Sequence, residues 1–285
     1  GLDQDMPGND HLWTDQVLAS QMGAATEAAR RVLTATYRMR IDEPSRWCAP
    51  PNCYGERKSD QHTIEHQHLA GKAVAKAVTL LKNDGVLPFT KKAGIKTIAV
   101  VGAIADFMPD MEQQAFAPSV YNGGGSGSVP SGSIVTPFEG IKEWARKAGI
   151  EVVGRHARMS EVWAAVESAR QADAVVVVGG CTAMEFIDRE VIDGNANLEM
   201  GLGVNQMIEA VAAVKPTVVL MQTPGAVVMP WLDKVSAVMN LFLAGEQTGT
   251  GWGRVLFGDA TPEGKLPISF PLSAQDPDTV IRPNP

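Results

Sequence analysis

Two runs of consecutive apolar residues constrain the fold of this chain most strongly. Residues 175–178 are four valines, and residues 217–221 read Thr-Val-Val-Leu-Met without a regular polar alternation. A strand with one face in water alternates apolar and polar residues, whereas a strand covered on both faces does not. Both runs are therefore expected to be strands of a mainly parallel sheet with helices on its two faces.

The pattern around these runs alternates strands and helices, which is typical of a layered α/β domain. Two amphipathic helices are expected before the sheet, over residues 15–40 and from Thr63 to Leu81, the second ended by Asn83-Asp84-Gly85. Residues 42–61 between them have the composition of a linker. Strands are expected at 97–102, 151–154, 174–179, 217–222 and 237–243, and helices at 137–148, 160–172, 204–214 and 248–257, with a helix or turn near 230–234.

Composition limits the classes of partner. The chain has 285 residues, of which 45% are hydrophobic, so it can bury a sizeable core. Its net charge of −7 comes from scattered acids, and no basic cluster with interleaved aromatic residues occurs. This argues against nucleic acid and anionic membranes as partners. No run approaches the roughly 18 apolar residues of a membrane span. Since the first residues are neither an initiator Met nor a signal peptide, we expect an internal fragment of a longer protein.

Three cysteines bear on the cellular compartment. Cys48 and Cys53 lie close together in a Pro-containing loop that can hold them within disulfide range; the alternative is two free thiols. A disulfide there would indicate an oxidising compartment. Cys181 follows a buried strand without a His nearby in the sequence, which favours a packing role over nucleophilic catalysis.

Acidic residues gather shortly after the four valines, in residues 185–193, which we call the acid loop. In a parallel sheet, ligands bind beyond the carboxyl ends of the strands, and catalytic acids need partial burial to shift their pKa. A carboxylate taken alone is more often solvated or salt-bridged than catalytic, but the position after a buried strand makes Glu185 and Glu190 the candidate catalysts. The segments expected to share this rim are Asp106, the acid loop, Thr223-Pro224-Gly225 and Gly245-Glu246-Gln247.

A second candidate is Gly123-Gly124-Gly125-Ser126-Gly127-Ser128, the Gly/Ser segment. It lacks the Lys of a phosphate-binding loop, so its glycines are interpreted as letting the backbone pass close to a ligand or a neighbouring domain. A flexible solvated loop is the alternative. The histidines at 62, 66 and 68 lack the further ligands of a metal site. We expect no metal and no cofactor.

Ordered motifs along the whole chain resemble glycoside hydrolase family 3, the β-glucosidases and their relatives. They comprise Gly1-Leu2-Asp3-Gln4-Asp5-Met6-Pro7-Gly8, Leu80-Leu81-Lys82-Asn83-Asp84-Gly85-Val86-Leu87-Pro88, residues 124–127, Met229-Pro230-Trp231, Ala244-Gly245-Glu246-Gln247-Thr248-Gly249 and Leu256-Phe257-Gly258-Asp259-Ala260-Thr261-Pro262-Glu263-Gly264-Lys265-Leu266-Pro267. In that family the nucleophilic Asp belongs to a Ser-Asp-Trp motif of a (β/α) barrel, shortly before the first of these segments.

The resemblance implies a division into parts. Residues 1–41 would be the C-terminal remnant of the catalytic barrel, with its terminal helix, and residues 42–61 the linker that carries Cys48 and Cys53. Residues 62–285 would form the family's six-stranded α/β sandwich domain. By the order of the loop glutamates before Asn197-Leu198, Glu190 is the preferred acid/base and Glu185 the second choice. Ser126, flanked by Gly125 and Gly127, would bind sugar hydroxyls.

The resemblance therefore implies a secreted retaining β-glycosidase, most simply a β-glucosidase that acts on β-glucosides or oligosaccharides by double displacement. The isolated chain would be nearly inactive, because its partner carboxylate lies in the upstream barrel. A fibronectin-like domain follows in many relatives. The alternatives are a β-xylosidase or N-acetylglucosaminidase of the same family, and a non-catalytic carbohydrate-binding module.

Overall fold

The structure is a computed structural model that describes residues 3–4, 13–43, 61–109, 117–129, 131–154, 161–187, 189, 198–201 and 203–274. The chain divides into two compact units, Gly1–His62 and Thr63–Pro285, and each unit has its own arrangement of elements. Among the helices that the structure describes, none combines the length and the apolar character that a bilayer span requires.

The first unit contains two consecutive helices, α1 (Asp15–Ser20) and α2 (Met22–Arg38). The Thr14 side chain caps α1 by accepting from the backbone N–H of Val17 at 3.3 Å. The single helix predicted over residues 15–40 is wrong at one point, because the backbone of Gln21 leaves the helical region (φ −120°, ψ 34°). Apolar side chains of this unit remain exposed, among them Met22 (61%) and Tyr37 (59%). Within the described part of the unit, the apolar stripe of α2 is thus largely uncovered.

The second unit is built around one six-stranded sheet with the order β1-β6-β5-β4-β2-β3. All neighbouring strands are parallel except β1, which runs antiparallel to β6 at the edge. The predicted mainly parallel sheet is confirmed. The strands are β1 (Thr79–Asn83), β2 (Thr97–Val101), β3 (Glu151–Val153), β4 (Ala174–Gly180), β5 (Thr217–Gln222) and β6 (Ala237–Leu241).

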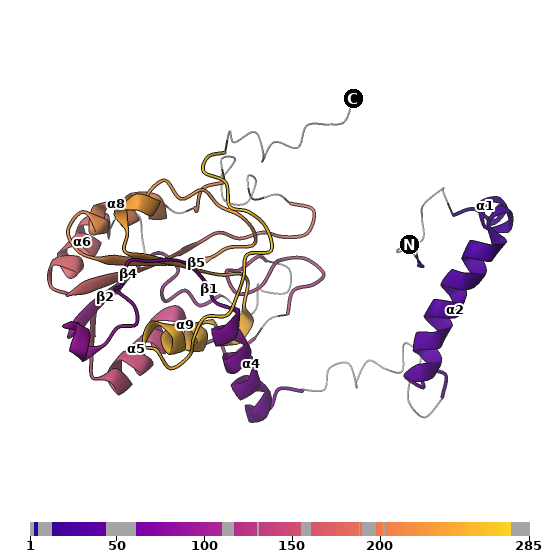
Figure 1. The fold of residues 1–285 in the computed structure, drawn as a ribbon, viewed down its shortest axis with the longest axis horizontal. Coiled ribbons are helices and arrows are strands. Elements are labelled where there is room, and N and C mark those ends of the chain that lie inside the picture. Colours follow the sequence, from indigo (N-terminus) through magenta and orange to yellow (C-terminus); the bar gives the residue numbers. More distant parts are fainter. Residues whose placement is uncertain are drawn as a thin grey trace. The chain divides into compact units, whose positions relative to one another are not determined.

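Helices cover both faces of this sheet. One layer holds α4, α5 and α9, and the opposite layer holds α6 and α8 (Figure 1). The helices are α4 (Ile64–Ala77), α5 (Pro137–Ala148), α6 (Val162–Arg170), α8 (Val204–Ala212) and α9 (Thr248–Leu256), with short 3-10 turns η2 (Lys91–Ala93), η4 (Leu232–Lys234) and η5 (Gly245–Gln247).

The apolar runs owe their lack of alternation to these two layers. In β4, Val176 and Val178 pack with the α4–α5–α9 layer, whereas Val175 and Val177 pack with the α6–α8 layer. All four are fully buried. Each apolar side chain removed from water contributes about 1.5–3 kcal/mol before the loss of conformational entropy, so this strand anchors the core.

The segment after α4 corrects the sequence prediction. The helix expected from Thr63 to Leu81 ends at Ala77, and the next residues form edge strand β1. Val74, Val78 and Leu81 continue a helical spacing, which explains the error. In the fold, Thr79 instead pairs with Asn240 of β6. Tertiary pairing along the open edge of β6 therefore overrides the local period. The other predicted helices and strands of this unit agree with the structure to within a few residues at each end.

Helices α5 and α9 lie in unusually close contact. A Cβ on Gly140 would come within 2.0 Å of the carbonyl oxygen of Gly249, and a Cβ on Gly249 within 2.0 Å of that of Thr136. Glycine is thus required where the two backbones touch. This contact fixes the start of α9, which lies beside the carboxyl end of β6.

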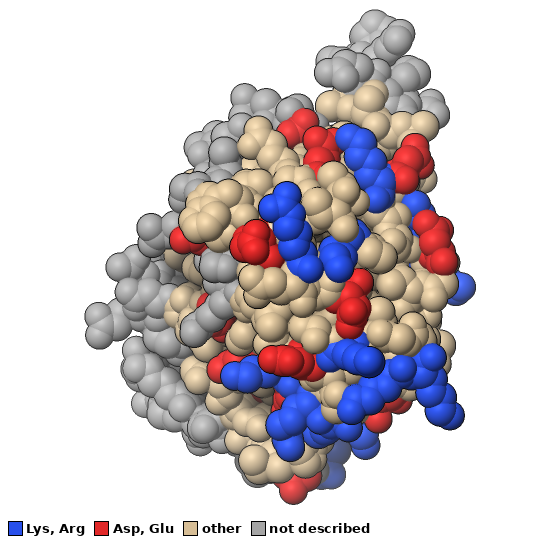
Figure 2. Space-filling model, turned by 90° about the vertical axis from the view of Figure 1, so that its left-hand side faces the viewer, with Lys and Arg blue, Asp and Glu red and all other residues tan. Residues whose placement is uncertain are grey.

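Charges are distributed over the surface with both signs. On the face shown in Figure 2, Lys and Arg side chains gather in the lower part, and Asp and Glu side chains lie among them. An example of such mixing on α5 is the exposed pair of Lys147 and Glu143, 2.7 Å apart. Exposed pairs of this kind contribute little to stability, about 0–1 kcal/mol each. Pairs of this kind therefore do little to hold the fold together.

Candidate functional site

The carboxyl ends of the strands meet around one short segment, residues 120–124. The backbone N–H of Gly124 donates to Ala183 after β4 at 3.0 Å, and the Gln222 side chain at the end of β5 donates to the carbonyl of Val120 at 3.1 Å. The N–H of Gly245, after β6, donates to the carbonyl of Tyr121 at 2.8 Å. The loops expected to share a rim are thus gathered there by hydrogen bonds.

The Gly/Ser segment and the acid loop lie directly against each other. Gly124 forms a parallel bridge with Met184, and the N–H of Glu185 donates to the carbonyl of Gly124 at 3.2 Å. The backbone N–H of Ser126 in turn donates to Glu185 Oε2 at 2.9 Å. Two residues proposed for the site from different parts of the sequence are therefore in contact.

This contact sets the charge state of Glu185. The N–H of Ser126, and then its side chain, stabilise the charged carboxylate and lower the pKa of Glu185 from its ordinary value. The carboxylate is otherwise exposed to solvent. In this arrangement Glu185 suits a hydrogen-bond acceptor or a negative charge better than a proton donor at neutral pH.

Gly125 makes the contact possible. Its φ of +97° lies in the region that favours glycine, and a Cβ there would be 2.5 Å from the Cβ of Glu185 and 2.9 Å from its Oε2. The sequence predicts that this glycine lets the backbone approach a ligand or a neighbouring domain. In the structure it lets the backbone approach the acid loop.

A polar network fixes the Gly/Ser segment at its base. The Ser119 hydroxyl donates to Asn122 Oδ1 at 2.7 Å, and the Asn122 amide donates to the Ser128 hydroxyl at 2.8 Å. The Tyr121 hydroxyl donates to the carbonyl of Phe107 at 2.7 Å, and burial raises the pKa of this tyrosine so that it stays neutral. Gly124 and Gly125 are buried. These contacts favour a built loop over the flexible solvated alternative.

Two acids expected on the rim already have partners in the chain. Asp106 accepts from the hydroxyl of Thr136 at 2.9 Å, and Glu246 accepts from that of Ser131 at 2.8 Å. Their carboxylates therefore help to hold the rim together. Thr223, the first residue after β5, donates to the buried Asn240 at 3.1 Å.

The structure adds residues that sequence reasoning does not single out. Gln222 is fully buried and also accepts from the indole N–H of Trp252 at 3.4 Å, so it links the Gly/Ser segment to α9. The sequence signal that could have identified Gln222 is its position as a polar residue directly after the apolar run 217–221. Arg189 is one charge of the acid loop in the sequence, but its contacts with other loops cannot be read from the sequence.

Several predicted residues lie outside the described part of the chain. These are Glu190, Asp193 and the pair Cys48 and Cys53. Within the described residues, Gly127 and Ser126 are exposed beside Glu185. Phe186, next to Glu185, has a positive φ of 65° and a 98% exposed side chain. An aromatic ring therefore projects from the acid loop. No group of three potential His, Cys, Asp or Glu metal ligands occurs among the described residues.

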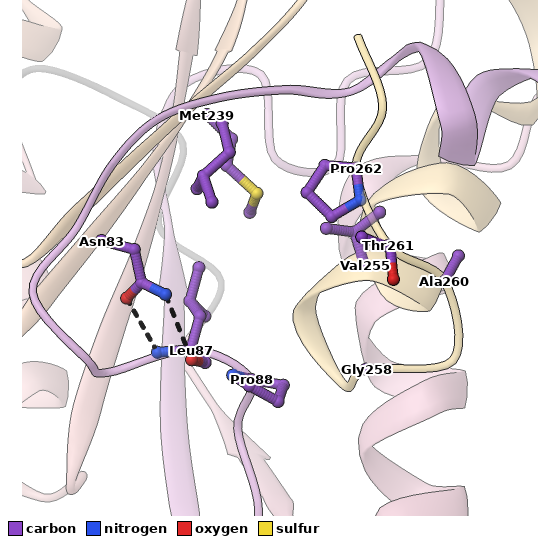
Figure 3. A pocket seen from close by; sticks show the side chains of 10 residues that line it. Asn83, Leu87, Pro88, Met239, Val255, Gly258, Ala260, Thr261 and Pro262 are labelled. Carbon is purple, nitrogen blue, oxygen red and sulfur yellow. Dashed lines mark hydrogen bonds between the residues drawn. The ribbon is translucent and has the colours of Figure 1, made fainter.

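A hollow of about 260 Å³ lies away from this rim, between the β1 edge and the end of α9 (Figure 3). Its side chains are mainly apolar, and the Asn83 amide donates to the carbonyl of Leu87 at 3.2 Å while its oxygen accepts from the N–H of the same residue. Asn83 pairs with Ala237 at the amino end of β6. Since parallel sheets bind ligands at the opposite ends of their strands, this hollow is a poor candidate for the substrate site.

Comparisons with known proteins agree with this architecture. The family model of the glycosyl hydrolase family 3 C-terminal domain matches residues 78–284. The chain is 29% identical over 301 residues to a probable β-glucosidase L of Aspergillus terreus, covering 97% of this chain and 40% of that protein. It is 33% identical over 222 residues to thermostable β-glucosidase B of Acetivibrio thermocellus, covering 73% of this chain and 26% of that protein.

Solved structures show the same fold. A family 3 β-glucosidase from Neurospora crassa aligns with a TM-score of 0.68 and 25% identity, over 77% of this chain and 27% of that one. A β-D-glucoside glucohydrolase from Trichoderma reesei aligns with a TM-score of 0.71 and 24% identity, over 100% of this chain and 42% of that one. The chain thus spans less than half the length of these relatives.

Proposed function

The chain belongs to glycosyl hydrolase family 3, and from that membership we propose that it supplies the acid/base glutamate of a retaining β-glucosidase. The names of its relatives, which are β-glucosidases, support this activity. The observation that carries the proposal is the contact between the Gly/Ser segment and the acid loop at the carboxyl rim of the sheet, with Ser126 donating to Glu185 at 2.9 Å.

The chemistry requires a second carboxylate. Retaining hydrolysis uses two carboxyl groups about 5–5.5 Å apart, one attacking the anomeric carbon and the other protonating the leaving oxygen and later activating water. We propose that the nucleophile comes from the barrel whose C-terminal end is residues 1–41. The acid loop would then supply the second carboxyl group of the pair.

Glu190 remains the preferred acid/base in this proposal, with Glu185 second. A general acid must hold its proton near the working pH, and the hydrogen bond from Ser126 lowers the pKa of Glu185. Glu185 could act only after a bound sugar takes over the N–H of Ser126 or the nucleophile's charge raises its pKa. With its carboxylate charged, Glu185 and Ser126 would instead bind sugar hydroxyls.

The test uses the complete enzyme, with the nucleophile-bearing barrel joined to this chain, and aryl β-glucosides as substrates. We expect Glu190→Gln to lower kcat by about 10²–10⁴-fold on a poor leaving group, and Glu185→Gln chiefly to raise KM. Azide should rescue Glu190→Ala but not Glu185→Ala. If azide rescues only Glu185→Ala, Glu185 is the acid/base and Glu190 is not. Full activity of both Glu190→Gln and Glu185→Gln would reject the proposal.

The same assay addresses the substrate. Aryl β-xylosides and N-acetylglucosaminides, tested beside β-glucosides, report whether the family's other specificities apply. The chain without a barrel should bind sugar weakly and turn over none of the three substrates. Sugar binding by the complete protein without any turnover would support the carbohydrate-binding alternative.

We also propose that the protein is secreted, because a disulfide between Cys48 and Cys53 would indicate an oxidising compartment. Both cysteines lie outside the described residues, whereas Cys181 is buried with a free thiol. Thiol titration under denaturing, non-reducing conditions should therefore find one reactive thiol per chain. Three reactive thiols would contradict the disulfide and remove the main support for an extracellular location.

A further inference from the structure

Described contacts tie the acid loop and the residues that flank it to the rest of the rim. At its start, Glu185 and the nearby Ala183 bond to Gly124, as described above. Beyond its end, the carbonyl of Leu198 accepts from the N–H of Val228 at 2.9 Å. The first point lies on the Gly/Ser segment and the second on the loop after β5. Glu185 and Leu198 are therefore tied to two different loops of the rim.

Arg189, within the acid loop, contacts residues that follow β4 and β5. Its Nη1 donates to the carbonyl of Ala226 at 3.0 Å and lies 3.6 Å from the sulfur of Cys181. Ala226 belongs to the loop after β5, and Cys181 is the first residue after β4, with its N–H donating to the carbonyl of Gln222 at 3.2 Å. One guanidinium thus joins the acid loop to the ends of two neighbouring strands.

These polar contacts matter because the described part of the acid loop buries little apolar surface. Phe186 is 98% exposed and Ile187 is 37% exposed, so hydrophobic packing of these two side chains contributes little. A segment with few buried apolar contacts opens at low free energy unless hydrogen bonds hold it. Arg189 supplies two such contacts, both from Nη1.

We infer that Arg189 is a positioning residue that holds the acid loop against the loop after β5 and so fixes where its glutamates meet the sugar. Arg189 directly precedes Glu190 and lies four residues after Glu185, the two candidates for the acid/base. A displacement of about 1 Å at a reacting group can cost about 100-fold in rate. The inference rests on the proposed function for its catalytic consequence, but the attachment itself is a property of this chain.

The attachment is tested first in this chain alone, through the thiol of Cys181. That side chain is 3% exposed and lies beside the guanidinium. The background carries Cys48→Ser and Cys53→Ser. In it, we expect the Cys181 thiol of the Arg189→Met variant to react with a thiol reagent several times faster than that of the parent. The rate in Arg189→Lys should be intermediate. Arg170→Met is the matched control, because Arg170 is exposed at the end of α6 and its ion pair with Glu167 is long, at 3.5 Å.

The catalytic consequence is tested in the complete enzyme. Per folded molecule, Arg189→Met should lower kcat about 10–100-fold with KM changed less than about threefold, and Arg189→Lys should restore part of the loss. Arg170→Met should keep the parent's kcat and KM. A purely structural role would lower Tm and the folded fraction while leaving kcat per folded molecule unchanged.

The outcomes separate the two proposals. If Arg189→Met leaves the Cys181 thiol as protected as in the parent, the attachment is wrong. If the thiol becomes reactive but kcat per folded molecule is unchanged, the positioning role is wrong. If Arg189→Met does not fold, Arg189→Lys and Arg189→Gln decide by the same two measurements. Failure of the proposed function shows separately, as full activity of both glutamate-to-glutamine variants.

Discussion

Replacement of Gly125 by alanine tests how the Gly/Ser segment is joined to the acid loop. The new Cβ would lie 2.5 Å from the Cβ of Glu185, whose backbone is tied to Gly124, at a φ of +97°. A non-glycine residue in such a backbone conformation costs about 1–3 kcal/mol. Forced overlap costs a similar amount, about 1–3 kcal/mol where neighbours cannot move. Since this loop can partly yield, we expect a total loss of about 2–4 kcal/mol.

The assay is thermal and urea unfolding of Gly125→Ala beside Gly127→Ala. Gly127 lies in the same segment, but a Cβ there would meet no atom within 4 Å, so its replacement should be nearly neutral. For a domain of this size, Tm falls by about 2–4 °C per kcal/mol. A double-mutant cycle with Glu185→Gly separates the two costs. The steric overlap needs the side chains of both residues, whereas the strain of the positive φ depends on residue 125 alone. We expect a coupling of about 1 kcal/mol or more.

A second measurement follows Gly125→Ala by NMR titration. If the added methyl group moves the N–H of Ser126 away, the pKa of Glu185 should rise toward its ordinary value of 4.5. Gly127→Ala should leave that pKa low. Equal stability of the two alanine variants, together with an unchanged pKa of Glu185, would refute the geometry on which the candidate site is built.

Three further predictions concern the framework. Asp173 accepts from two backbone N–H groups at the start of β2, and these bonds lower its pKa. The charged carboxylate therefore stabilises the fold at pH values above the unfolded pKa of 3.8, and this stabilisation is lost as the pH falls below that value. The stability difference between wild type and Asp173→Asn, measured by urea unfolding, should shrink between pH 6 and about pH 3. Thr136→Ala removes the N-cap of α5 and a bond to Asp106, and should cost about 1–2 kcal/mol in urea unfolding, whereas Thr136→Ser should cost less. Gly140→Ala should cost about 1–3 kcal/mol or prevent folding, because Gly249 cannot move without shifting α9, and a neutral result in thermal unfolding would contradict the close helix contact.

Local patterns were sufficient for the class of fold and for most elements. The unalternating valines of β4 predicted a strand covered on both faces, and the start of α5 predicted at Pro137 coincides with a capping box of Thr136 and Glu139. The prediction failed where a period was ambiguous: residues 79–83 fit a helix locally but form β1 by pairing with β6. The missing information was the identity of the partner strand.

The α/β class, the two-sided burial of the central strands and the polar residues where those strands end can all be read from the sequence. Burial and helix capping act within a few residues, so they leave a local signature. The strand order, the approach of Gly125 to Glu185 and the target of Arg189 depend on the assembled fold. The hydrogen bond of Arg189 spans 37 positions and that of Ser126 spans 59, and no local pattern specifies which distant group a donor will meet.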